Sequence, residues 1–110
     1  MDLMEGKVTA RGKKQNVLDM FENLEGYYDK ELLSENGSED DYTIQFNFSM
    51  SMRNFFCSDY FASPSEEYDC EIKAEMIGED EGFGAGPTLT LIYKSGEIIQ
   101  GLAFYGLDNI

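Results

Sequence analysis

The stretch Tyr42–Met52, YTIQFNFSMSM, decides the fold of this 110-residue chain. Apolar side chains alternate with uncharged polar ones throughout it, and neither Gly nor Pro interrupts the run. A period of two in a segment rich in aromatic and β-branched residues predicts a long strand with one buried face. The polar face would consist of an uncharged stripe: Thr43, Gln45, Asn47, Ser49 and Ser51. We expect the opposite face, from Tyr42 to Met52, to anchor the core.

A strand and a helix are expected before this stretch. Residues 5–11 alternate and stop at Gly12, which indicates a short first strand. Apolar residues then recur at helical spacing through Leu24, with Asn16 placed to cap the helix and Gly26 to end it. Residues 27–41 are interpreted as a connection, of which residues 34–41 form an acidic, Gly-containing loop.

The second half of the chain predicts three more strands. Residues 53–68 hold many aromatic side chains and are interpreted as an irregular packed segment, with a short helix near residues 64–68 capped by Ser63. Alternating or apolar runs at residues 69–77, 88–93 and 97–105 indicate an antiparallel meander, and Ser95-Gly96 is a typical hairpin turn.

This order of elements predicts a single α+β domain over residues 1–110, a mostly antiparallel sheet with one main helix on one face. A ferredoxin-like arrangement with a shortened second helix and an extra strand fits it most simply. If the first strand and the central strand are joined through the helix in one sheet, they form a βαβ unit with a right-handed crossover.

Charge is the outstanding feature of the composition. The chain has 22 acidic and 8 basic residues, a formal net charge of -14, and residues 27–110 alone carry 17 acids and four bases. Such a body repels nucleic acid and anionic membranes and attracts basic surfaces, including the grooves in which proteins hold nucleic acid. Acidity also serves solubility. No apolar run reaches the length of a membrane span, so we expect a cytoplasmic protein that binds neither membrane nor nucleic acid directly.

The sequence contains few of the residue patterns that catalytic or cofactor sites require. The chain has no histidine, which removes the commonest general base and metal ligand. The Gly-rich run at residues 82–87 leads into Pro87 and a strand, whereas a phosphate loop leads into a helix. Neither acidic run, at residues 39–41 or 79–81, has the spacing of a calcium loop. We therefore expect no enzyme activity, no cofactor and no metal.

Residues 79–86, EDEGFGAG, follow a predicted strand, and a second strand leads from them to Lys94-Ser95-Gly96-Glu97-Ile98. This pattern resembles the ferredoxin-like Api-type domain of uncharacterised plasmid and phage proteins. The resemblance covers chiefly residues 69–100 and implies that fold and a mobile-element origin. Between residues 53 and 68 the chain departs from the family, in which a clear second helix is expected. In size and charge alone, the chain also resembles small acidic phage inhibitors that imitate nucleic acid, including anti-CRISPR proteins.

The leading hypothesis is a non-enzymatic acidic inhibitor that occupies the basic nucleic-acid groove of a host defence enzyme. Loops are where a partner can reach carboxylates. The predicted partner-binding residues are therefore Asp29, Glu31, Glu35, Glu39, Asp40, Asp41, Glu79, Asp80 and Glu81. The alternative is a structural or regulatory module that associates, with itself or another chain, through the uncharged stripe of the central strand.

Overall fold

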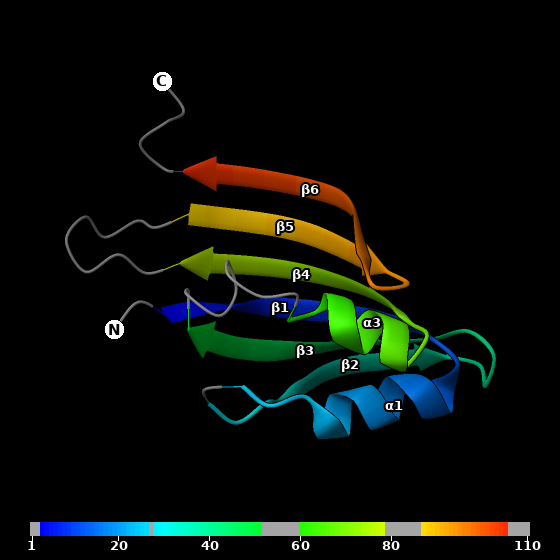
Figure 1. Cartoon of the computed structure of the whole chain (residues 1–110). Helices are drawn as coiled ribbons and strands as arrows, with labels where there is room; N and C mark the ends of the chain where they lie inside the picture. The colour runs from blue at the N-terminus through cyan, green and yellow to red at the C-terminus, as the bar shows by residue number, and fades with distance from the viewer. Residues whose placement is uncertain (1–2, 27, 52–59, 79–86, 106–110) are drawn as a thin grey trace.

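The computed structural model of the chain describes residues 3–26, 28–51, 60–78 and 87–105. Within these ranges, six strands form a single antiparallel sheet in the order β2-β3-β1-β4-β5-β6. The elements are β1 (Leu3–Gly12), α1 (Lys14–Asn23), β2 (Leu32–Gly37), β3 (Tyr42–Ser51), α3 (Ala62–Glu67), β4 (Glu71–Gly78), β5 (Pro87–Lys94) and β6 (Glu97–Tyr105). Both described helices lie against the same face of the sheet (Figure 1). The α+β class and the C-terminal meander are therefore confirmed.

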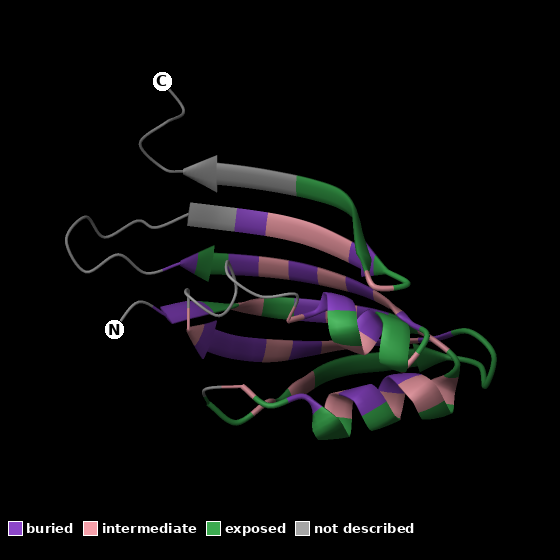
Figure 2. Cartoon of the chain, in the orientation of Figure 1, coloured by how far each residue is buried: buried purple, intermediate pink, exposed green. Residues whose placement is uncertain are grey.

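The core lies between the helices and the sheet, and buried residues recur along β3 (Figure 2). Phe46 is fully buried, and its ring meets the rings of Phe21 and Phe48 edge-on, with centroids 5.0 and 6.3 Å away. The alternate residues of β1 and β4 complete the same buried layer, as the period-two pattern predicts. The buried residues in this layer are Met4, Val8, Ala10, Tyr42, Ile44, Phe46, Phe48, Met50, Ile72, Ala74 and Met76.

The connection between the first two predicted strands was interpreted wrongly. Residues 32–37 form the edge strand β2, which pairs with β3 across a tight turn, where the sequence predicted a loop over residues 34–41. Strand β1 runs antiparallel to β3, so these two strands are not a βαβ pair. Strand β2 runs in the same direction as β1, and β3 lies between them. The helix thus links β1 to β2, and β3 returns as the hairpin partner of β2.

The helix boundaries also differ from those expected. Helix α1 begins at Lys14, two residues before the predicted cap Asn16, and no side chain caps it. Helix α3 begins at Ala62, so Ser63 lies inside it and is not its cap. Gly26 does not end α1, whose C-cap is Leu24. A Cβ at Gly26 would lie 2.8 Å from the carbonyl oxygen of Ser49, so glycine there allows the chain to pass close to β3.

A type I′-like turn joins β5 and β6, as the sequence predicted. Ser95 and Gly96 both have positive φ, 53° and 83°. Residues 79–86, which hold the acidic, Gly-rich run between two predicted strands, lie outside the described residues. Neither described helix is long and apolar enough to cross a membrane.

Candidate functional site

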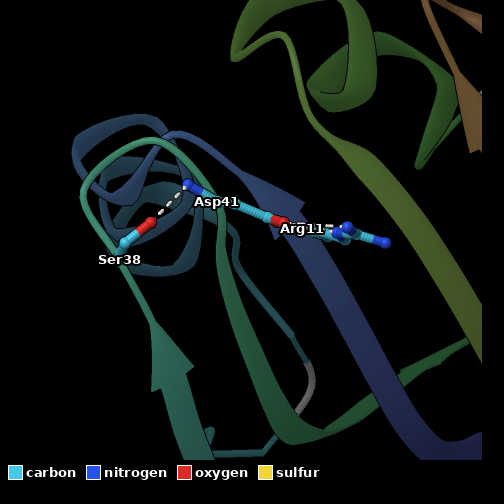
Figure 3. Close-up of polar contacts among 3 residues, drawn as sticks. All are labelled: Arg11, Ser38 and Asp41. Carbon is cyan, nitrogen blue, oxygen red and sulfur yellow. Dashed lines mark hydrogen bonds and ion pairs between the residues drawn. The ribbon is translucent and has the colours of Figure 1, made fainter.

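The β2–β3 hairpin carries four of the predicted partner-binding acids: Glu35 in β2, and Glu39, Asp40 and Asp41 in the turn. Asp41 is tied to Arg11 of β1, whose Nε and Nη2 donate to its two carboxylate oxygens at 2.8 and 2.9 Å (Figure 3). These hydrogen bonds lower the pKa of Asp41 and raise that of Arg11. The backbone N–H of Asp41 donates to Oγ of Ser38, which fixes the turn from the other side.

Other acids of this turn are held to the helix side of the sheet. Glu39 lies 3.7 Å from the ammonium of Lys14, and its carbonyl oxygen accepts a hydrogen bond from the Lys14 backbone N–H. The hydroxyl of Tyr42 donates to Glu35, and this hydrogen bond raises the pKa of Tyr42. The first turn of α1 and the hairpin are thereby locked together, so the carboxylates occupy a defined place in the fold.

Asp29 and Glu31 lie at the far end of β3, in a segment that we call the strap (residues 28–31). The N–H of Tyr28 donates to Oγ of Ser49 at 2.8 Å, and the N–H of Glu31 donates to the side-chain oxygen of Asn47. The N–H of Asn47 in turn donates to the carbonyl of Glu31 at 3.0 Å. Two residues of the uncharged stripe thus hold the strap against the sheet. A neutral hydroxyl and amide suit this role because they bond backbone groups without adding charge.

Lys30 closes the strap onto the helix. Its ammonium donates to the carbonyl of Phe21 in the last turn of α1 and lies 4.8 Å from the centre of the Phe21 ring. Burial lowers the pKa of Lys30, while the acidic neighbours Glu22 and Glu25 act in the opposite direction. A cation at a helix C-terminus also interacts favourably with the helix dipole. The bases in this part of the molecule therefore serve internal contacts.

The strand order brings these segments together along one edge of the sheet (Figure 1). Residues 13–41, from the start of α1 to the β2–β3 turn, contain nine acids and three bases. We call the nine carboxylates the acidic edge: Asp19, Glu22, Glu25, Asp29, Glu31, Glu35, Glu39, Asp40 and Asp41. Asp19 and Glu22 of α1, and Glu25 just beyond its end, were not among the predicted residues. Their position on the polar side of an amphipathic helix was visible in the sequence, but the edge that this helix joins was not.

The remaining strands are charge-balanced. Strands β1, β3, β4, β5 and β6 together contain four acids and four bases. In β1 and β4 the charged side chains alternate with buried ones and lie on the sheet face opposite the helices, which we call the open face. The register sets Lys7 opposite Glu75, and Arg11 opposite Glu71. The excess negative charge of the described residues therefore resides outside these five strands.

Three of the predicted partner-binding residues, Glu79, Asp80 and Glu81, lie outside the described residues. Within the described ranges, no three acidic or cysteine side chains gather as a potential metal site. Cys70 is buried, and burial raises the pKa of its thiol to about 11. A thiol in this state is a poor nucleophile near neutral pH.

Comparison with known proteins does not assign the chain to a family. No family model, no curated protein and no solved structure matches the chain.

Proposed function

We propose that this chain is a non-enzymatic acidic binding protein that docks its acidic edge on the basic, nucleic-acid-binding surface of another protein. The biological setting in this proposal is a phage or mobile element, and the target is a host defence enzyme of the CRISPR or restriction type. By occupying the nucleic-acid-binding groove of that enzyme, the protein would exclude the nucleic acid from it.

The separation of charge between edge and sheet is the observation that carries this proposal. A chain that is acidic only for solubility can spread its carboxylates evenly. Here nine acids and three bases fall in residues 13–41, while five of the six strands are neutral in sum. A directional negative field of this kind steers a basic partner to one side of the molecule.

The number of charges on the edge is compatible with nucleic-acid imitation. One strand of B-form DNA presents one phosphate every ~3.4 Å. The acidic edge has nine carboxylates, of which Asp41 and Glu39 have basic partners within 4 Å. The nine are spread from α1 through the strap and β2 to the β2–β3 turn, so the likeness is in the number of charges and not in a matched spacing.

A ferredoxin-like core is part of the same proposal. The order β2-β3-β1-β4, with α1 between β1 and β2 and α3 between β3 and β4, supports a ferredoxin-like unit to which β5 and β6 are added. The position of β2 at the end of this order makes the acidic edge accessible.

The test uses the full chain immobilised on a column and a lysate of bacteria that carry CRISPR or restriction systems. We expect proteins to be retained at low salt, to be released as salt rises, and to be displaced by duplex DNA or by RNA. Each displaced protein is then purified, and its nucleic-acid binding is measured with and without this chain. Retention that ignores salt, or binding that leaves the partner's nucleic acid in place, would overturn the proposal.

A second candidate is association through the open face, which is charge-balanced and carries no described helix. Of its uncharged stripe, Asn47 and Ser49 already hold the strap, and Gln45 donates to Thr9 of β1. Thr43 and Ser51 are the two end members of the stripe. Light scattering over a range of protein concentrations distinguishes this candidate, because it requires a mass that grows with concentration. A constant monomer mass would exclude self-association.

A further inference from the structure

The open face is hollowed beside the strap, which lies along the edge of β3. This hollow has a volume of about 480 Å³ and is lined by Glu5, Gly6, Lys7, Tyr28, Asp29, Asn47, Phe48, Ser49 and Ile77. Its floor follows the register of three adjacent strands, in which Glu5 of β1 lies opposite Ser49 of β3 on one side and Ile77 of β4 on the other. Its wall is the strap, from which Tyr28 and Asp29 contribute.

The lining combines apolar surface with an excess of carboxylate. Tyr28 and Ile77 are 58% and 57% exposed, although large apolar side chains are usually buried. Two of the three charged groups, Glu5 and Asp29, are acidic. The third, Lys7, is basic; it lies opposite Glu75 in the adjacent strand, and the Glu75 carboxylate is also 3.7 Å from the ammonium of Lys73.

We infer that this hollow receives an arginine side chain of the protein partner. The inference rests on the proposed function, since it names the contact that anchors the partner's basic surface beside the acidic edge. A guanidinium is planar and weakly hydrated, stacks on an aromatic ring and bonds a carboxylate through two parallel N–H groups. Tyr28 offers the ring, Glu5 and Asp29 offer the carboxylates, and Ile77 offers apolar surface to the methylene stem.

The wall of the hollow is already in place before a partner arrives. Ser49 and Asn47 hold the backbone N–H groups of Tyr28 and Glu31, and Lys30 ties the strap to α1. A site that needs no ordering on binding loses less entropy when the partner docks. Asp29 also belongs to the acidic edge, so the hollow lies where that edge meets the open face.

An oligo-arginine peptide and an oligo-lysine peptide of equal length test the inference on the full chain. Both peptides are attracted by the net charge, but only arginine stacks and bonds in the described manner, so we expect tighter binding of the arginine peptide. Tyr28→Leu and Glu5→Gln should each remove this preference, with a loss of about tenfold in arginine-peptide affinity and less for the lysine peptide. Equal affinity for the two peptides in the unmodified protein would overturn the inference.

The control is Glu71→Gln, which removes one charge from the same open face outside the hollow. This variant should weaken the binding of both peptides to the same extent and keep the preference for the arginine peptide. If Glu71→Gln and Glu5→Gln have the same effect, the binding is a general charge attraction and the hollow is not the site. Amide shifts of Asn47, Ser49 and Ile77 on addition of a capped arginine give an independent reading, and their absence counts against the site.

These outcomes separate the inference from the proposed function. If the arginine peptide is not preferred, the inference fails, but this chain can still compete with nucleic acid for a partner. Failure of that competition, with the arginine preference retained, would instead remove the proposed inhibitor role and leave an arginine-binding hollow.

Discussion

Arg11 and Asp41 are joined by two parallel hydrogen bonds of 2.8 and 2.9 Å, which tie the second residue from the end of β1 to the residue before β3. The pair lies at the surface, with both side chains more than half exposed. One of the carboxylates predicted to bind a partner is thus already engaged within the fold. A partner that approaches this turn meets Asp40 and Glu39 more directly than Asp41.

Asp41→Asn should lower stability slightly at neutral pH, since an exposed ion pair contributes little. The pKa of Asp41 is lowered in the folded protein, so the pair stabilises the fold above the unfolded-state pKa, and this contribution is lost as pH falls through the folded-state value. Urea unfolding of both proteins at several acidic pH values measures the difference. The difference in the free energy of unfolding between the two proteins should close as the pH falls. A gap that is independent of pH would contradict this account.

Phe46→Ala should be severely destabilising. The ring is fully buried against Phe21 and Phe48, and its removal leaves a cavity that costs roughly 3–5 kcal/mol. Thr43→Ala, on the opposite face of the same strand, serves as the control and should cost much less. Urea denaturation gives both values. Similar losses for the two variants would mean that the core does not lie on the helix side of β3.

Ser49→Ala should loosen the strap. It removes the acceptor of the Tyr28 N–H, a loss of about 0.5–1.5 kcal/mol for a typical hydrogen bond. Hydrogen exchange is the sharper measurement, since the Tyr28 amide should exchange faster while amides in the middle of β1 keep their protection. An unchanged exchange rate at Tyr28 would show that Ser49 does not hold the strap in solution.

Ser65→Ala should detach α3 from the β5–β6 turn. The buried Ser65 hydroxyl donates to the carbonyl of Ala62 at 2.7 Å and accepts from the N–H of Gly96 at 3.0 Å. An unsatisfied partner left behind costs about 1–3 kcal/mol. Gly96→Ala strains the same turn, because Gly96 has a φ of +83°, a conformation that residues with a Cβ rarely adopt. Thermal unfolding should show a lower midpoint temperature for each of the two variants. Midpoints equal to that of the unmodified protein would show that this contact does not stabilise the fold.

Elements that are defined by the spacing of apolar residues were predicted well from the sequence. Elements that are defined only by backbone hydrogen bonds to a neighbouring strand were predicted poorly. Residues 42–51 alternate strictly, and the buried face of β3 followed from that pattern. Residues 34–37, Ser-Glu-Asn-Gly, have no apolar face, yet they pair with β3 through backbone hydrogen bonds as an exposed edge strand. A strand without a buried face carries almost no periodic signal. For this reason β2 was predicted as a loop.

The candidate site depended on topology that local patterns do not encode. That residues 29–41 are acidic was plain from the sequence, as was the lack of charge on the stripe of β3. That Asn47 and Ser49 of this stripe hold residues 28–31 required the fold, since the hydrogen-bonded residues are 16 and 21 positions apart. The balance of charge across β1, β4, β5 and β6 likewise emerges only when the strand boundaries are known.

Two variants with equal changes in charge test the central claim, that the acidic edge docks on a basic nucleic-acid-binding surface. The edge variant combines Glu31→Gln, Glu35→Gln, Glu39→Gln and Asp40→Asn. The control variant combines Glu66→Gln and Glu67→Gln in α3, Asp69→Asn in the turn that follows, and Glu71→Gln at the start of β4. Asn is a suitable replacement at Asp69 because it tolerates the positive φ of 47° found there. Circular dichroism first establishes that both variants are folded.

The deciding measurement is the amount of protein that each immobilised variant retains from the bacterial lysate and that duplex DNA or RNA then displaces. The account predicts that the control variant retains nearly as much of this material as the unmodified chain, and that the edge variant retains about tenfold less or none. Equal losses in the two variants would contradict it, because binding would then follow net charge and not the acidic edge.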